Sequence, residues 1–521
     1  MKKLLKFVGF VLFFVVFSYV TARLFFPDYL TQVVSKIGFG VDQKDVSTDK
    51  PLVIAFSNGA ESFEPTKYDS VNRAWMVDVY EGLVRVDENL RVEPSLAISW
   101  GTTDDLTWEF KLRPEVRFHD GRTFNAQDVK FSIERAKTFE QSDLTNLLST
   151  ITKVEVTDQL GLRVVTSVVD PVLLNKLAAV YVVPDGTQDV GTKPIGTGVY
   201  KVDQFDPGKR LVLALASYYW DKIKKPRFQK VELVAISDKD SRIDALLSKK
   251  VMFLSQVPPG AVSLLQSVKD VSVVTRPSFE VTFLAFNFNQ REGRNIFSNK
   301  AVREATVHAI DQKKVIDFTK AYGNPASQFT SRGVFGFDPS IKLRSFDVDK
   351  ASKLVRSYES FSRLKGSLDL VKGMEVLGDY LTDQFFQIGI DLTVNYHELA
   401  DLQEKVARGE SDFYFLGWRS ELGDIGDFYK FVVHSPTTDG TFGRFNAGIF
   451  QNKKVDELIE KSEKILESSE RIKVLREVMN ILVEEDIFGV PLFEPEVIYA
   501  FDKSLTWTPR FDGYVIPSSI K

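Results

Sequence analysis

The chain has 521 residues, of which 44% are hydrophobic and 26% are charged, and this composition excludes extensive disorder and a polytopic membrane protein. The formal net charge is only -4, and no basic stripe interleaved with aromatic residues is present, so we expect no nucleic-acid partner. Cysteine is absent, which excludes disulfides, thiolate metal sites, thiol nucleophiles and a lipidated cysteine anchor.

The N-terminal segment combines a basic flank with a long apolar run. Three lysines among the first six residues precede the apolar stretch 7–22, a pattern typical of a secretory signal or an uncleaved anchor. Val20-Thr21-Ala22 could serve as a cleavage site, but the apolar character resumes at 24–26 and would extend a helix to about 30 Å, enough to span a bilayer. We therefore predict that residues 1–26 are a membrane anchor, or a signal segment if cleaved, and that 27–50 are a linker. The folded part would lie on the extracytoplasmic face of the cell membrane, or be secreted or periplasmic after cleavage.

The first half of the folded body mixes strand and helix patterns. Leu52–Phe56 is a short continuous apolar run, the pattern of a buried strand. Residues 69–80 show helical spacing, and 125–137 are a second expected helix. Period-two alternation predicts strands at Thr107–Leu112 and 162–168, so this stretch should contain a sheet.

Strands and helices continue to interleave after residue 191. Three further strands are expected at 200–205, 210–216 and 230–236. Late in the chain two amphipathic helices are predicted at 455–466 and 472–482, with Ser468 or Ser469 as the cap between them. The fold class is therefore mixed α/β with several lobes.

No catalytic or metal motif stands out. Nucleophile elbows, paired zinc spacings, P-loops and calcium loops are all absent. The chain has four histidines, and no two of them have the spacing at which one helix face shares a metal. We expect a protein without catalytic residues, metal ligands or a cofactor, and not an enzyme.

Several separated stretches carry a family resemblance. SFEP at 62–65, VYEGLVRVDENLRVEPSLAISW at 79–100 and LTWEFKLRPEVRFHDGRTFNAQDVKFSIER at 106–135 stand in this order. PIGTGVYKVDQFDPG at 194–208 and DIFGVPLFEPEVIYAF at 486–501 follow. Together these stretches resemble the extracellular solute-binding proteins of family 5, the oligopeptide, dipeptide and nickel-binding components of ABC transporters.

The resemblance implies a two-lobe periplasmic-binding-protein clamp, similar to type II, with an additional inserted domain. Lobe I would comprise 51–81, 191–280 and 489–521, the inserted domain 82–190, and lobe II 281–488. The hinge is expected near 279–289 and 488–493, and the lobes would close around a trapped solute.

In peptide-binding relatives, a strand with a Gly-Trp pair runs along the ligand backbone, and an acid three positions later holds the amino terminus of the peptide. Gly417 and Trp418 match this pair, and Glu421 stands at the acidic position. Asp424 matches a second common acid. The sequence departs from the pattern at two positions. Glutamate replaces the usual aspartate at position 421, and Ile425 replaces the usual proline. A glutamate is longer by roughly 1.5 Å, so it would hold the ammonium farther off or recognise another group.

Backbone groups up to Arg419 could pair with an extended peptide as an added strand. We expect Arg419 to be a neighbour of Glu421 only in sequence, because adjacent strand residues point to opposite faces. The remaining predicted ligand-binding residues are Tyr68, Asp69, Ser70 and Asn287. Alternative readings are a core position for Trp418, a surface ion pair for Glu421 and turn capping for Asn287.

The resemblance predicts a protein that binds short peptides and delivers them to the permease subunits of an ABC importer. The solute could instead be a metal chelate, an opine or an oligosaccharide. A membrane-presented solute sensor or chaperone is the alternative outside transport. The expected partners are thus a small solute, the permease, and the membrane through the N-terminal segment.

Overall fold

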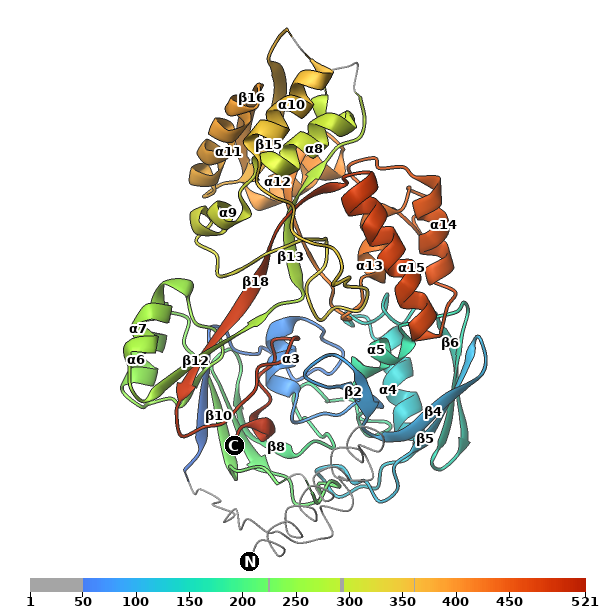
Figure 1. Ribbon diagram of the computed structural model, residues 1–521. Helices are drawn as coiled ribbons and strands as arrows, with labels where there is room; N and C mark the ends of the chain where they lie inside the picture. Colours follow the sequence, from blue (N-terminus) through green and yellow to red (C-terminus); the bar gives the residue numbers. More distant parts are fainter. Residues whose placement is uncertain (1–49, 224, 291–294, 360) are drawn as a thin grey trace, which may run out of the picture. The chain divides into compact units, whose positions relative to one another are not determined.

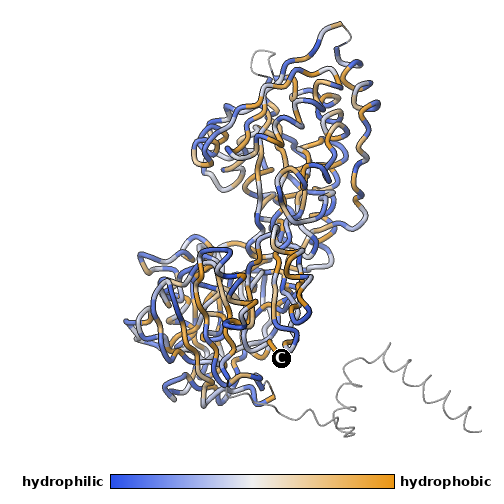
Figure 2. Tube along the Cα trace, turned by 90° about the vertical axis from the view of Figure 1, so that its left-hand side faces the viewer, coloured by the Kyte–Doolittle hydropathy of each residue, from blue (hydrophilic) through white to orange (hydrophobic). Residues whose placement is uncertain are grey.

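The computed structural model describes residues 50–223, 225–290, 295–359 and 361–521. The expected anchor or signal segment, and all of the linker except Lys50, lie outside the described residues. Within the described ranges, no helix is long and apolar enough to cross a membrane. Figure 2 shows short apolar and polar stretches alternating along this part of the trace.

Strand β1 (Leu52–Phe56) lies inside the largest sheet. It pairs in parallel with β10 (Lys230–Ala235) and with β11 (Phe253–Leu254), which explains its continuous apolar sequence, because such strands are covered on both faces. The sheet continues through β9 (Arg210–Leu215) to β8 (Tyr200–Asp206). The four strands predicted in these regions are confirmed.

Helices cover this half of the sheet. They are α3 (Ser70–Met76), α6 (Lys239–Leu247) and α7 (Val262–Ser267). One core cluster contains Trp75, Tyr80 and Tyr200, all nearly inaccessible to solvent. Burial of these large aromatic side chains is a main stabilising contribution to this half.

A separate four-stranded antiparallel sheet is formed earlier in the chain. Its strands, in spatial order, are β4 (Ala97–Asp104), β5 (Thr107–Leu112), β7 (Gly161–Thr166) and β6 (Ile151–Asp158). The alternating residues of β5 turn Trp108, Phe110 and Leu112 into the core, as the period-two pattern predicts. Helix α4 (Ala126–Thr138) packs on this sheet and begins with a capping box between Asn125 and Asp128. A small hairpin of β2 (Val84–Val86) and β3 (Val92–Pro94) lies beside it.

The later part of the chain adds the other half of the large sheet. The strands are β13 (Glu280–Phe286), β14 (Gly323–Pro325), β15 (Leu364–Val371), β16 (Ile390–His397) and β17 (Phe413–Arg419). The helices are α8 (Lys300–Ala309), α9 (Gln312–Phe318), α10 (Val348–Tyr358), α11 (Glu375–Gln387), α12 (Leu399–Ala407), α13 (Gly426–Phe428), α14 (Lys453–Ser462) and α15 (Ser468–Asn480). Two core clusters rich in phenylalanine lie in this half.

The predicted pair of late helices corresponds to α14 and α15. The cap prediction is wrong: the N-cap of α15 is Glu467, whose carboxylate accepts a hydrogen bond from the Ser469 amide. Glutamate is an uncommon cap, because its longer side chain must fold back to reach the backbone, so the pattern favoured the serines instead.

Strand β18 (Gly489–Asp502) connects the two halves of the sheet. Its first residues pair with β13 and its last residues pair with β12 (Val271–Pro277). Figure 1 shows β18 and β13 running together between the two groups of elements. The chain therefore crosses between the halves both at 277–280 and along β18.

Candidate functional site

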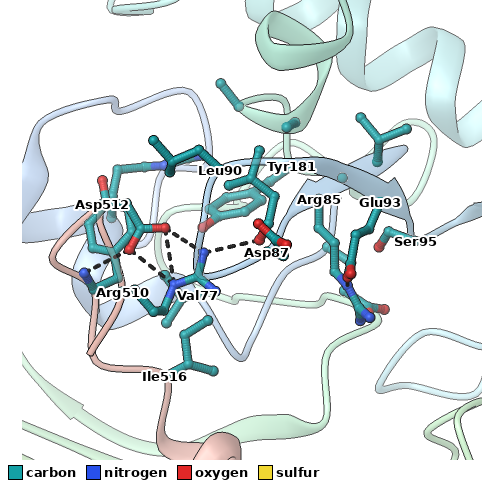
Figure 3. Close-up of a pocket in the computed structure, with 18 of the residues that line it drawn as sticks. Val77, Arg85, Asp87, Leu90, Glu93, Ser95, Tyr181, Arg510, Asp512 and Ile516 are labelled. Atoms are coloured by element: carbon teal, nitrogen blue, oxygen red, sulfur yellow. Dashed lines mark hydrogen bonds and ion pairs between the residues drawn. The ribbon is translucent and has the colours of Figure 1, made fainter. Parts of the chain in front are cut away.

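A cavity of about 350 Å³ lies where segments from distant parts of the sequence meet. Its walls come from α3, the β2–β3 hairpin, the residue just before β13, the end of β17 with the turn that follows it, and the C-terminal tail around Asp512. Figure 3 shows Tyr181, Arg85 and Arg510 among the side chains around this space. No linear motif could define such a wall, because its parts are joined only by the tertiary structure.

Buried polar groups fix the walls of the cavity. Asp78 accepts two hydrogen bonds of 2.7 Å from the amide and hydroxyl of Ser518 and so ties the tail to the segment after α3. The carboxylate of Glu81 accepts hydrogen bonds from Thr197 and from the Trp220 indole. These buried and part-buried bonds hold the lining in one arrangement, because leaving either carboxylate unpaired would be costly.

Three arginines of the lining have carboxylate partners. Arg510 makes a forked ion pair with Asp512 (Figure 3). It also donates to the Val86 carbonyl, at 3.0 Å. This pairing and the nearby acids raise the pKa of Arg510 despite its burial. Arg85 pairs with Glu93 at 3.3 Å. These guanidinium groups are largely engaged by the protein itself.

Arg73, on α3, is the fourth arginine of the lining and is only 5% exposed. Its guanidinium lies 3.7 Å from the ring centre of Tyr181 and 5.3 Å from that of Tyr68. Burial raises the pKa of Tyr68 to about 12, although the nearby Arg73 lowers it. Tyr68 therefore carries its proton at neutral pH and can donate a hydrogen bond.

Glu421 lines the cavity, as the sequence predicts for a ligand-binding residue. The expectation about Arg419 is wrong: its Nε lies 2.9 Å from Glu421 Oε1. The two residues are two positions apart and the chain leaves β17 between them, so the rule for adjacent strand residues does not separate them. The alternative of an ion-paired Glu421 is thus present in the structure, although 54% of its side chain remains exposed.

Glu280 joins this pair from the neighbouring strand. In the antiparallel register of β13 and β17, Glu280 stands opposite Arg419. Burial raises the pKa of Glu280, the Arg419 charge lowers it, and the Glu421 charge raises it further. The charge of Arg419 therefore acts on both carboxylates, although its ion pair is with Glu421. Sequence reasoning missed Glu280, because the register that brings it to Arg419 is not readable from either segment.

Gly417 and Trp418 lie on β17 and are not among the residues that line the cavity. The Trp418 ring packs near Phe428, with ring centres 5.8 Å apart, and its indole donates to Asp427 at 3.3 Å. Burial raises the pKa of Asp427 to about 8. In this arrangement Trp418 packs against the core, which was the alternative reading, while the exposed Gly417 pairs with β13.

Asp424 is bound by the protein itself rather than directed into the cavity. Its carboxylate makes two hydrogen bonds with the guanidinium of Arg471, of 2.5 and 2.9 Å, and accepts a third from the Gly426 amide. Asp424 and Arg471 are 7% and 3% exposed. The acid of the motif therefore joins the start of α13 to α15.

The facing loop contributes one lining residue. Tyr68 borders the cavity, whereas Asp69 is the N-cap of α3 and accepts a hydrogen bond from the Asn72 amide. Ser70 is the first residue of that helix and is exposed. The loop thus serves mainly to begin α3, which in turn positions Arg73.

Asn287 is fully buried outside the cavity. Its amide donates to the carbonyls of Gly409 and Ser411, both at 3.0 Å, and its oxygen accepts from the Asn289 amide. All of these partners belong to the protein backbone. The geometry matches the capping alternative, since the side chain ties the end of β13 to the turn before β17.

The described part of the chain contains no group of three histidine, aspartate or glutamate side chains that could hold a metal ion.

Comparison with protein families gives a match to bacterial extracellular solute-binding proteins, family 5 Middle, over residues 91–440. The chain belongs to this family of solute-binding proteins. Membership makes it an extracytoplasmic solute-binding component of the kind that serves ABC importers, and not an enzyme.

The relatives of this solute-binding protein agree with the family match. The glutathione-binding protein GsiB of Salmonella paratyphi A is 24% identical over 476 residues, which cover 88% of this chain and 91% of GsiB. HbpA2 from Haemophilus parasuis has a similar structure, with a TM-score of 0.82, 19% identity, and coverage of 91% of this chain and 99% of HbpA2. The murein tripeptide binding protein MppA, in an unliganded open form, also has a similar structure, with a TM-score of 0.81 and 20% identity. The match covers 91% of this chain and 98% of MppA. The fold is therefore the mixed α/β periplasmic binding protein fold with extra sheets.

Proposed function

We propose that this solute-binding protein binds short peptides in the cavity and delivers them to the permease subunits of an ABC importer. The observation that carries the proposal is the group of Glu280, Arg419 and Glu421, in which Arg419 pairs with Glu421 and its charge also acts on the neighbouring Glu280. Such a group has a spare negative charge. The ammonium of a peptide amino terminus would balance it, because a carboxylate removed from water needs a cationic partner.

We infer further that the two halves of the sheet act as the lobes of a clamp, with 82–190 as an inserted domain. Support comes from β18, which pairs with strands of both halves, and from the Ser278 amide, which donates to the Pro495 carbonyl at 2.8 Å. Only these two narrow connections would have to bend for the lobes to close. The cavity lies beside the first of them, since Phe279 belongs to its lining.

Residues 1–26 complete the proposal as a membrane anchor, or as a signal segment if they are cleaved. Both readings place the cavity on the extracytoplasmic face, where an importer takes up its solute. N-terminal sequencing of the protein after membrane fractionation distinguishes them: an intact Met1 in the membrane pellet indicates the anchor, and a new N-terminus in the soluble fraction indicates cleavage.

Native mass spectrometry of the purified protein tests the choice of solute. We expect a series of copurifying masses whose fragmentation identifies short peptides. A single non-peptide mass would overturn the peptide assignment and favour a metal chelate, an opine or an oligosaccharide. If nothing copurifies, trialanine is titrated by calorimetry, and the absence of binding to trialanine and to a mixed tripeptide library would contradict the proposal.

A further inference from the structure

Arg73 differs from the other arginines of the cavity. Arg85, Arg419 and Arg510 each make an ion pair with a carboxylate. Within the described residues, Arg73 makes no such pair, and its buried Nη1 has no hydrogen-bond partner. It nevertheless belongs to the cavity lining. The cavity lining thus contains one buried arginine that has no carboxylate partner within the described part of the chain.

The packing around Arg73 compensates for only part of its charge. The rings of Tyr181 and Tyr68 provide cation–π contacts, which are worth about 0.5–2 kcal/mol each. They accept none of the guanidinium hydrogen bonds, whereas burying an unpaired charge costs several kcal/mol. An anion that enters the cavity would provide the charge partner that the packing does not supply.

The charge of the lining indicates which anion fits. Seven carboxylate side chains and four arginines border the cavity, so the wall is negative overall. A multiply charged anion such as phosphate would be repelled by this wall. A carboxylate carries a single charge, matches the planar fork of a guanidinium, and is tolerated when its molecule also carries an ammonium.

Two tyrosine hydroxyls add neutral donors to the lining of the same cavity. Tyr68 and Tyr514 line the cavity. Burial raises the pKa of both phenols, and the charge of Arg73 acts on both. They therefore keep their protons at neutral pH and can donate to a carboxylate oxygen that Arg73 already binds.

We propose that Arg73, with Tyr68 and Tyr514, forms a carboxylate subsite that binds the free carboxyl terminus of a short peptide. The ammonium end would lie at Glu421, and that half of the inference rests on the proposed function. The two ends border the same cavity, since Arg73, Tyr68 and Glu421 all belong to its lining. A cavity of about 350 Å³ lies at the small end of ligand pockets. The favoured solute is thus a zwitterionic di- or tripeptide held at both ends.

Calorimetry of the full chain with trialanine and its C-terminal amide tests the subsite. The wild type should bind the acid about 30-fold more tightly than the amide, as expected for a charge-paired hydrogen-bonded contact. Arg73→Met should reduce this ratio to less than about threefold. The matched control is Arg85→Met, which removes a paired arginine of the same wall and should keep the ratio. A wild type that binds acid and amide equally would overturn the subsite while leaving peptide binding intact.

Thermal unfolding separates a binding role from a structural one. Since Arg73→Met removes an unpaired buried charge, the variant without added peptide should be as stable as the wild type or more stable. A lowered melting temperature, with equal losses of affinity for acid and amide, would assign Arg73 to the scaffold and contradict the inference.

If the wild type binds neither peptide, the proposed function fails but the subsite is still tested. Acetate and phosphate are then titrated while the arginine side-chain NMR signal that is missing in Arg73→Met is followed. A saturable response to acetate that exceeds the response to phosphate supports a carboxylate site. No response to acetate, or a stronger response to phosphate, overturns it.

Discussion

Replacement of Glu421 by glutamine removes one negative charge from the cavity while keeping the size of the side chain. In the wild type, Glu421 pairs with Arg419, whose charge also acts on Glu280. In Glu421→Gln, one carboxylate and one guanidinium remain, so the group has no charge left for a ligand ammonium. Removing one partner of a hydrogen-bonded charge pair costs 2–5 kcal/mol. We expect about 2 kcal/mol, or roughly 30-fold weaker binding of trialanine, because Glu421 is 54% exposed and partly screened.

The assay is isothermal titration with trialanine and with N-acetyl-trialanine, which lacks the ammonium. Glu421→Gln should weaken binding of the free amine and change binding of the acetylated peptide by less than about twofold. The matched control is Glu93→Gln, which removes another carboxylate of the cavity wall, paired with Arg85, and should affect both peptides equally. The reasoning is refuted if Glu421→Gln leaves the ratio of the two affinities at its wild-type value.

Three further substitutions concern residues that the protein holds internally. Asp424→Asn leaves the buried guanidinium of Arg471 without its carboxylate, so chemical denaturation should show a free energy of unfolding that is lower by about 3–5 kcal/mol. The affinity for trialanine should stay unchanged. Weaker binding of trialanine without a loss of stability would contradict this prediction. Asn287→Ala removes two buried donors to backbone carbonyls and should cost about 1–3 kcal/mol of unfolding free energy, again at constant affinity. Because burial raises the pKa of Asp427 to about 8, the folded state binds more protons than the unfolded state between pH 4 and 8, and stability should fall as the pH rises through that window, with a slope of at most about 1.4 kcal/mol per pH unit. Asp427→Asn should flatten this profile, and an equally steep profile in that variant would show that another group titrates.

The sequence was most informative where structure depends on neighbouring residues. The alternation of Thr107–Leu112 predicts β5 with its bounds, and the apolar run of Leu52–Phe56 does the same for β1. Asn125 lies just before α4 and caps it. Such patterns persist in the folded chain because side-chain period, caps and turns act over a few residues. Together with the motif order, they were sufficient for the fold class and the family.

The sequence was least informative about which side chains bind a solute. Glu421 and Asp424 stand three residues apart in one motif, yet the first borders the cavity and the second is enclosed by Arg471, 47 positions later. Asn287 was a predicted cleft residue but bonds to the backbone near 409–411. In each case the partner that decides the role comes from a distant segment, so the motif alone could not distinguish a ligand contact from an internal one.

By itself, the sequence determined the mixed α/β class, the membership in a solute-binding family and the position of one lining acid, Glu421. Only the tertiary structure decided that Glu280 stands opposite Arg419 and that Arg73 is enclosed among tyrosines, with no carboxylate partner among the described residues. The physical reason is that periodicity and capping are local, whereas the pairing of a buried charge depends on every segment packed around it. A ligand site built from distant segments is therefore a property of the folded chain.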